Sequence, residues 1–191
     1  YRTGRGVDRN MGEAVKWYQK AVELGYPKAQ YALGLLNFTG QGLEKNERDG
    51  MVLIQAAAEG GLADAEYATG LAYLKGSGGY AKDEAEATKW FRKAAEQGHL
   101  KALYALGHMN PAKGVKKDDP SAFKWISEAA ELGYPQAQYD LGYFYAKGRG
   151  TAKDEAEAVK WYRKAAEQGH RDAEYALGCA YVDGKGVDED P

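Results

Sequence analysis

The sequence contains one pattern that could support a serine nucleophile. Ser121 and Lys124 have the Ser-x-x-Lys spacing in which a lysine one helical turn away can activate a serine hydroxyl. The Ser-Asp-Asn and Lys-Thr-Gly segments that accompany this pattern in such enzymes are absent from the sequence. Segments with the same helical pattern carry a glutamate in place of Ser121, at Glu13, Glu86 and Glu157. We therefore interpret Ser121 as part of a helix start, and we predict no catalytic residues.

The residue types that bind metals do not have the spacing of a metal site. His99, His108 and His170 show no ligand spacing, and Cys179 has no evident histidine partner. Residues 183–188 carry aspartates like a calcium-binding loop, but the closing glutamate is missing. A single cysteine also cannot form an internal disulfide. The sequence thus predicts neither a metal nor another cofactor.

Paired glycines recur along the sequence and could be mistaken for phosphate-binding loops. The pairs are Gly4/Gly6, Gly40/Gly42, Gly76/Gly78, Gly148/Gly150 and Gly184/Gly186. A phosphate-binding loop would continue into Gly-Lys-Ser or Gly-Lys-Thr, and none of the pairs does so. Because glycine tolerates the left-handed conformation, we interpret the pairs as tight turns between antiparallel helices.

Composition and charge exclude two classes of partner. The 26 Lys and Arg nearly balance the 28 Asp and Glu, for a net charge of −2, whereas a nucleic-acid-binding protein normally has a large basic excess. No apolar run approaches the roughly 20 residues that span a bilayer. We therefore expect no nucleic acid partner and no membrane insertion. The first residues, Tyr1-Arg2-Thr3-Gly4, suggest an excised segment and leave the localisation open.

An internal repeat organises the whole sequence. Residues 81–99 and 152–170 differ at only two positions and begin 71 residues apart, which is two periods. The period itself is set by five landmarks at intervals of 36, 37, 35 and 36 residues: Trp17, Leu53, Trp90, Trp125 and Trp161. Five landmarks that keep one period predict a repeat architecture.

Each period contains two helical patterns. Helix A runs through segments such as AQYALGLLNF and AEYALGCAYV, and helix B runs through EAVKWYQKAVEL and its equivalents. Helix B is expected to begin after a capping side chain at Asn10, Asn46, Asp83, Asp118 or Asp154. It is expected to end before a glycine suited to a left-handed helix end, at Gly25, Gly61, Gly98, Gly133 or Gly169.

The repeat resembles the Sel-1-like repeat, a relative of the tetratricopeptide repeat. Residues 145–169 read YAKGRGTAKDEAEAVKWYRKAAEQG, in which the tyrosine, the paired glycines, the aspartate, the tryptophan and the Lys-Ala-Ala-Glu run carry the resemblance. This resemblance covers essentially the whole chain. It implies an all-α fold, a right-handed α/α solenoid (superhelix) of antiparallel helix pairs with a period of 35–37 residues.

We expect one repeat array over residues 1–191. It comprises a half repeat at 1–25, full repeats at 26–61, 62–98, 99–133 and 134–169, and a half repeat at 170–191. The resemblance implies an adaptor that binds a protein or peptide. Family members act in quality control in the eukaryotic endoplasmic reticulum, or as exported bacterial proteins, so the resemblance does not fix a compartment.

Helical geometry separates a buried side of helix A from an outward side. With the glycine of each helix A (Gly34, Gly70, Gly107, Gly142, Gly178) as position 0, positions −5, −2, −1 and +3 lie within about 140° and are small or apolar in most copies. Position −3 is tyrosine in every copy and lies about 170° from the centre of that stripe. Tyrosine is enriched at interfaces because it combines contact area with a hydroxyl group.

We predict a binding groove on the concave face, formed by the tyrosines and the variable positions +1 and +4 beside them. The predicted partner-binding residues are Tyr31, Tyr67, Tyr104, Tyr139, Tyr175, Leu35, Phe38, Leu71, Leu74, His108 and Tyr143. An equally weighted alternative is that each tyrosine packs on its neighbours and seals the seam between repeats. The two interpretations are compatible.

One repeat is irregular. After Gly107 the sequence reads His108-Met109-Asn110-Pro111, without the usual tyrosine and first glycine of the turn. Proline breaks a helix interior, so we expect helix A to end early there. A tolerated deletion in a surface turn is the simpler explanation. The other explanation is that His108, Met109 and Pro111 form a feature specific to one partner.

The sequence therefore predicts a non-enzymatic scaffold for protein–protein interaction. The alternative is a structural segment of a larger protein that positions other domains or self-associates end to end. The first helix B has no helix A before it and the last helix A has no helix B after it, and such uncapped apolar ends favour stacking.

Overall fold

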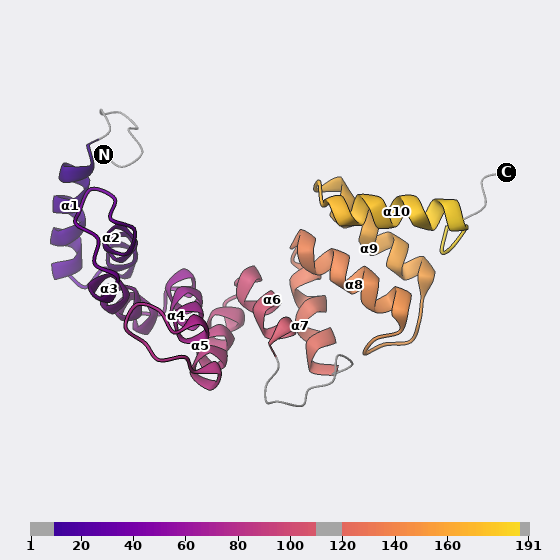
Figure 1. The fold of residues 1–191 in the computed structure, drawn as a ribbon, viewed down its shortest axis with the longest axis horizontal. Coiled ribbons are helices and arrows are strands. Elements are labelled where there is room, and N and C mark those ends of the chain that lie inside the picture. The colour runs from indigo at the N-terminus through magenta and orange to yellow at the C-terminus, as the bar shows by residue number, and fades with distance from the viewer. Residues whose placement is uncertain (1–9, 110–119, 188–191) are drawn as a thin grey trace. The chain divides into compact units, whose positions relative to one another are not determined.

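The computed structural model describes residues 10–109 and 120–187, which are helical without strands. The helices of these ranges are α1 (Met11–Glu23), α2 (Pro27–Thr39), α3 (Glu47–Glu59), α4 (Ala63–Lys75), α5 (Glu84–Glu96), α6 (Leu100–His108), α7 (Pro120–Glu131), α8 (Pro135–Lys147), α9 (Glu155–Glu167) and α10 (Arg171–Asp183) (Figure 1). The odd-numbered helices are the B helices of the sequence pattern, and the even-numbered helices are the A helices.

The chain divides into two compact units, residues 1–99 with α1 to α5 and residues 100–191 with α6 to α10. Within each unit, every helix packs against the next helix along the chain. This arrangement confirms the predicted all-α fold of consecutive helix pairs. It is also what a solenoid requires, because each pair can bury its apolar sides only against its neighbours.

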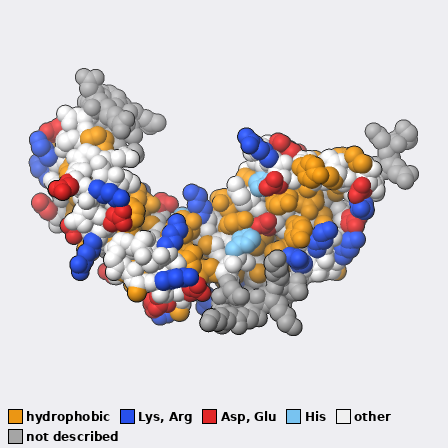
Figure 2. All heavy atoms as spheres, viewed as in Figure 1, with side chains coloured by type: hydrophobic (Ala, Val, Ile, Leu, Met, Phe, Trp, Pro, Cys, Tyr) orange, Lys and Arg blue, Asp and Glu red, His pale blue; other side chains and the backbone are white. Residues whose placement is uncertain are grey.

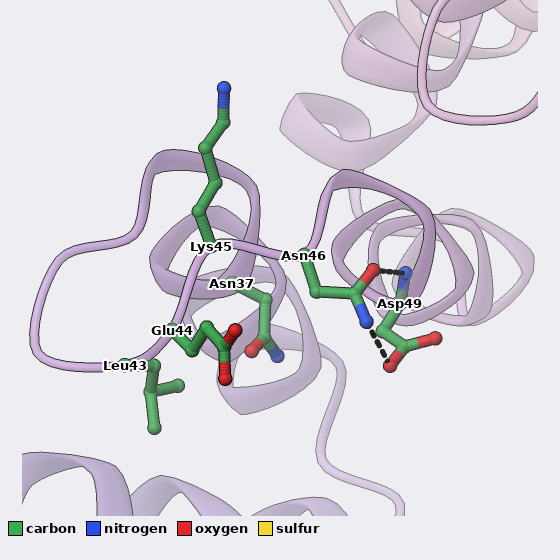
Figure 3. A pocket seen from close by; sticks show the side chains of 6 residues that line it. All are labelled: Asn37, Leu43, Glu44, Lys45, Asn46 and Asp49. Atoms are coloured by element: carbon green, nitrogen blue, oxygen red, sulfur yellow. Dashed lines mark hydrogen bonds between the residues drawn. The ribbon is translucent and has the colours of Figure 1, made fainter.

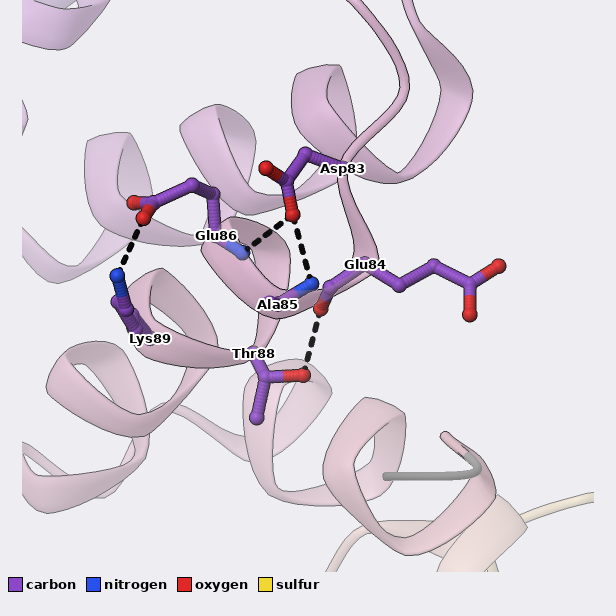
Figure 4. A network of polar contacts seen from close by, with 6 residues as sticks. All are labelled: Asp83, Glu84, Ala85, Glu86, Thr88 and Lys89. Atoms are coloured by element: carbon purple, nitrogen blue, oxygen red, sulfur yellow. Dashed lines mark hydrogen bonds and ion pairs between the residues drawn. The ribbon is translucent and has the colours of Figure 1, made fainter. Parts of the chain in front are cut away.

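Asparagine and aspartate side chains cap the odd-numbered helices as predicted. The confirmed caps are Asn10, Asn46, Asp83 and Asp154. Figure 4 shows one of them, in which Asp83 Oδ1 accepts hydrogen bonds from the backbone N–H groups of Ala85 (2.9 Å) and Glu86 (3.0 Å). These bonds satisfy N–H groups that have no partner within the helix. The fifth predicted cap, Asp118, lies outside the described residues.

Glycines in the left-handed conformation end the helices. The glycines two residues after α1, α3, α5, α7 and α9 have φ between 71° and 90°. The first glycine of each pair after α2, α4, α8 and α10 caps its helix with φ between 61° and 74°. Residues that carry a Cβ atom rarely adopt these backbone angles, which explains why glycine recurs at these positions. The prediction that the paired glycines form turns is therefore confirmed for the pairs that follow these four helices.

Helix α6 is shorter than its counterparts. It has 9 residues and ends at His108, whereas α2, α4, α8 and α10 have 13 residues each. The predicted early end is therefore confirmed. Pro111, on which that prediction was based, lies outside the described residues.

Small residues on the even-numbered helices allow close packing. The alanines at position −5 are at most 3% exposed: Ala29, Ala65, Ala102, Ala137 and Ala173. Five residues after each of the first four alanines, a glycine lies directly against a large side chain of the following odd-numbered helix. A Cβ atom would lie 2.6 Å from the Phe91 ring at Gly70 and 2.7 Å from the Tyr162 ring at Gly142. We call this arrangement, which Gly34 and Gly107 share, a glycine seat.

The core also contains polar side chains that the sequence pattern did not reveal. Glu66 and Gln138, at position −4, are 4% and 5% exposed. Each accepts a 2.7 Å hydrogen bond from a glutamine at the end of the following odd-numbered helix, Gln97 Nε2 to Glu66 and Gln168 Nε2 to Gln138. Burial raises the pKa of the Glu66 carboxyl group above its ordinary value, although the bond from Gln97 opposes this.

The glycine seats predict opposite effects of one substitution at two equivalent positions. Replacing Gly70 with alanine should lower the free energy of unfolding by about 1–3 kcal/mol, because the methyl group would overlap the Phe91 ring. Gly178, on α10, has open space around its Cβ position, so Gly178→Ala should raise that free energy by up to about 1 kcal/mol through helix propensity. Urea denaturation of dilute protein measures both. Equal effects of the two substitutions on the free energy of unfolding would contradict the glycine seat at Gly70.

Replacing Glu66 with glutamine should stabilise the fold at neutral pH, because the buried side chain then carries no charge. Its raised pKa means that the folded state binds this proton more tightly than the unfolded state, so ionisation of Glu66 costs stability. The advantage of the variant should be full above the folded-state pKa and should vanish as the pH falls below the unfolded value. Denaturation at several pH values measures this, with Glu23→Gln, at an exposed position on α1, as control. A difference that is independent of pH would contradict the assignment.

Candidate protein-binding face

The five predicted tyrosines lie one on each even-numbered helix. Tyr31, Tyr67, Tyr104 and Tyr139 are half-buried, whereas Tyr175 on α10 is 77% exposed. Burial raises the pKa values of Tyr31, Tyr104 and Tyr139 above the ordinary tyrosine value, which by itself already keeps the hydroxyl group protonated at neutral pH. Protonated hydroxyls can both donate and accept hydrogen bonds.

In the first unit the tyrosine rings pack toward the following repeat. Tyr31 lies against a core cluster that includes Met51 and Ile54 of α3. The ring of Tyr67 lies 5.5 Å from that of Phe91 on α5 and stacks on His99 at a centroid distance of 4.7 Å. Phe91 is also the side chain that fills the glycine seat of α4.

The second unit repeats this arrangement with different side chains. Tyr139 lies 5.7 Å from the ring of Tyr162 on α9 and stacks on His170 at 5.0 Å. Tyr104 makes an edge contact with Tyr134, which occupies the same turn position as His170, at 5.3 Å. In both units, therefore, a tyrosine contacts the turn residue before the next even-numbered helix.

These contacts place the tyrosine rings in the seam between repeats. In a helical wheel the tyrosines point away from the core of their own helix pair. In a solenoid the next pair along the chain supplies a second surface, and the rings pack toward that surface. The stacking partners His99, Tyr134 and His170 were not predicted as part of this face. Their signal was present, since an aromatic ring or imidazole recurs at that turn position. Partner binding by the half-exposed rings stays a prediction.

The variable positions beside the tyrosines differ in exposure. Leu35 is exposed, and Leu71 and Leu74 are half-buried. Phe38 is half-buried as well and packs against a core cluster that includes Met51 and Ala72. Tyr143 is half-buried and lies under the Arg149 guanidinium, 5.1 Å from the ring centroid. We call the side of the even-numbered helices with these residues and the five tyrosines the tyrosine face.

Asp140 gives the tyrosine face of the second unit a distinct polar group. It occupies position −2, where the other repeats have alanine, and its Oδ2 lies 2.9 Å from Nε2 of His108. Burial and then the neighbouring Asp140 carboxylate raise the pKa of Tyr104. Asp140 was not among the predicted residues, although its departure from alanine was the available signal. Figure 2 shows hydrophobic side chains gathered over α8 and α10 of the same unit.

Two pockets lie away from the predicted residues. One of about 390 Å³ is lined by Asn37, Leu43, Glu44, Lys45, Asn46 and Asp49. Figure 3 shows that it lies at the turn between α2 and α3, where Asn46 caps α3 through Asp49. The other, of about 1,100 Å³, lies between α9 and α10.

The described parts of the chain contain neither a metal-binding cluster nor a membrane-spanning helix. No group of three or more His, Cys, Asp or Glu residues there could hold a metal ion. None of the helices that the structure describes is both long and apolar enough to cross a bilayer.

A model of the Sel1 repeat matches the chain at residues 1–26, 27–62, 63–99, 100–134, 135–170 and 171–191. No curated protein matches it in sequence. Among solved structures, the chain is similar to c5321 of uropathogenic Escherichia coli, described as a protective antigen with an SLR fold. The two share 35% identity over 100% of this chain, with a TM-score of 0.90. The chain spans only 41% of the length of c5321.

Two further solved structures are similar to the chain. A Sel1 repeat protein from Oxalobacter formigenes is 37% identical over 96% of this chain and 75% of its own, with a TM-score of 0.87. The immunity protein Pa5087 from Pseudomonas aeruginosa is 30% identical over 86% of this chain and 61% of its own, with a TM-score of 0.55.

The seam contacts predict that equivalent tyrosines contribute unequally to stability. Tyr139→Ala should lower the free energy of unfolding by about 2–4 kcal/mol, because it removes the contacts with Tyr162 and His170. Tyr175→Ala should change it by less than about 0.5 kcal/mol, because that ring is 77% exposed. Thermal and urea denaturation of dilute protein measure both. A loss of stability from Tyr175→Ala as large as that from Tyr139→Ala would contradict the packing of Tyr139 in the seam between repeats.

Proposed function

Because the chain belongs to the Sel1 repeat family, whose members are commonly non-catalytic scaffolds for protein interaction, we propose that it binds a protein or peptide segment along the tyrosine face. The observation that carries this proposal is the recurrence of a half-exposed tyrosine at the same position of α2, α4, α6 and α8. An extended partner can contact such a series of equivalent side chains one after another. Each ring offers a large contact area at a low cost in side-chain entropy.

The seam packing supports binding by holding the rings in place. Stacking on His99 and His170 restricts Tyr67 and Tyr139 before a partner arrives. Ordering a free side chain at an interface costs about 0.5–1.5 kcal/mol, and a ring that is already ordered avoids most of this cost. A tyrosine can thus both seal the seam with one face of its ring and meet a partner with the part that stays exposed.

Specificity in this proposal comes from residues that differ between repeats. The first unit offers aliphatic contacts, of which Leu35 is the most exposed. The second unit offers Asp140 with His108, and Tyr143 with Arg149. We infer that the two units contact chemically different parts of a partner, an apolar part and a polar part. The chain would act as a scaffold without catalysing a reaction.

The test is affinity capture with an immobilised chain, followed by binding measurements with the partner that is recovered. Leu35→Glu should weaken binding of that partner at least tenfold, because it places a charge on the tyrosine face. Val52→Glu is the matched control, since Val52 is 61% exposed on α3, an odd-numbered helix. Tyr67→Phe keeps the ring and tests the hydroxyl group alone.

Circular dichroism must first show that both variants keep the helicity of the wild type, so that a loss of binding reports on the face and not on the fold. Equal binding by the wild-type chain and the folded Leu35→Glu variant would overturn the proposal. A loss of binding in Val52→Glu instead would locate the site on the odd-numbered helices.

A further inference from the structure

Asp140 places a charge at a position of the repeat that folds without one. The other four copies have alanine there: Ala32, Ala68, Ala105 and Ala176. The Asp140 side chain is only 19% exposed, although burying a carboxylate costs free energy unless an opposite charge compensates it. The packing of the repeat therefore does not explain why a carboxylate occurs at this place on the tyrosine face.

The second unit compensates the charge of Asp140 only in part. His108 Nε2 lies 2.9 Å from Asp140 Oδ2, and in the described part of the chain His108 is the one basic side chain within 4 Å of this carboxylate. A neutral imidazole donates a hydrogen bond without adding a positive charge. That bond uses one of the roughly four acceptor positions of the two carboxylate oxygens, so the carboxylate can accept from a further donor.

Tyrosines from three helices lie near this carboxylate. The ring of Tyr104 on α6 packs against His108, with 4.3 Å between the ring centroids. Burial first, and the charge of Asp140 after it, raises the pKa of Tyr104. Burial is also the largest cause of the raised pKa values of Tyr139 on α8 and Tyr162 on α9, and the charge of Asp140 is a smaller cause in both. One carboxylate thus acts on the hydroxyl groups of all three tyrosines.

A neighbouring ring of the same face already holds a cation of this chain. The Arg149 guanidinium, in the turn after α8, lies 5.1 Å from the ring centroid of Tyr143. A cation in this position is attracted by the negative face of the aromatic ring. Tyr143 follows Asp140 by three residues on α8, which makes the two side chains neighbours on the helix surface. The chemistry that attracts cations therefore adjoins a carboxylate that Arg149 does not pair with.

We propose that Asp140 and the rings of Tyr104 and Tyr139 form a site for one basic side chain of the segment that the tyrosine face binds. The carboxylate supplies the opposite charge and hydrogen-bond acceptors, and the rings attract the cation and cover the aliphatic part of the side chain. Arginine fits best, because its guanidinium can stack on a ring while it donates to a carboxylate. This inference rests on the proposed function and adds to it the chemistry of the partner.

The probe for the site is Nα-acetyl-arginine amide, and Nα-acetyl-citrulline amide, which has the same shape without the charge, is its control. The whole chain with ¹³C-labelled tyrosines is titrated with each compound at about pH 8, where imidazole groups are neutral, and at constant ionic strength. The titration extends to about 50 mM because one side chain should bind in the millimolar range. NMR should show saturable shifts of the Tyr104 and Tyr139 ring signals with the arginine compound alone.

Three variants locate the binding. Asp140→Ala gives the second unit the alanine of the other repeats, so the chain should keep its helicity, and the Kd of the arginine compound should rise at least about tenfold. His108→Lys places a cation of the chain itself beside Asp140, at an exposed position, and should weaken binding in the same way. Asp64→Ala, which removes an exposed carboxylate of the first unit, is the matched control and should leave both ring signals responding as in the wild type.

Three results would each overturn the inference: no saturable shift, equal shifts with the two compounds, or binding by Asp140→Ala that equals binding by the wild type. None of these results depends on the partner recovered by affinity capture. The proposed function fails by a different result, when the folded Leu35→Glu variant binds that partner as the wild type does.

Discussion

The fold depends on one contact that recurs, a large side chain of an odd-numbered helix set against a glycine of the preceding helix. Phe91 against Gly70 and Tyr162 against Gly142 bring the two backbones close enough for the neighbouring alanines to be buried. Without the close approach, the alanines would line a gap, and their small area would stabilise little. The same aromatic side chains then support the rings of Tyr67 and Tyr139. Core and candidate site therefore share residues.

This sharing gives the tyrosine face its character. Isolated tyrosines on a surface would be mobile. The ring of Tyr67 packs against Phe91 and His99, and that of Tyr139 packs against Tyr162 and His170, so part of each ring is already held in place. Packing alone can therefore account for the recurrence of tyrosine at this position of every repeat. The residues that distinguish one repeat from another, such as Leu35 and Asp140, carry the chemical differences between the two units.

The period, the caps and the helix-ending glycines could all be predicted from the sequence because each depends on residues close together in the chain. The environment of the tyrosines could not, because it depends on the following repeat, which a single-helix wheel ignores. The same reasoning explains Glu66. No pattern in the sequence singled out its position, because the hydrogen bond that accompanies its burial comes from Gln97, at the end of the next helix. Asp140 was missed because one departure from alanine carries little weight before its neighbours are known.

The near identity of residues 81–99 and 152–170 has a consequence for how the chain folds. Helices α5 and α9 present almost the same surface, so each is able to fill the seat of the other, at Gly142 or Gly70. The correct pairings join helices adjacent in the chain, whereas a swapped pairing must first close a much longer loop. Folding speed therefore distinguishes the two arrangements where contact energies do not. Slow refolding or synthesis in tandem copies should favour kinetic traps with exchanged helices.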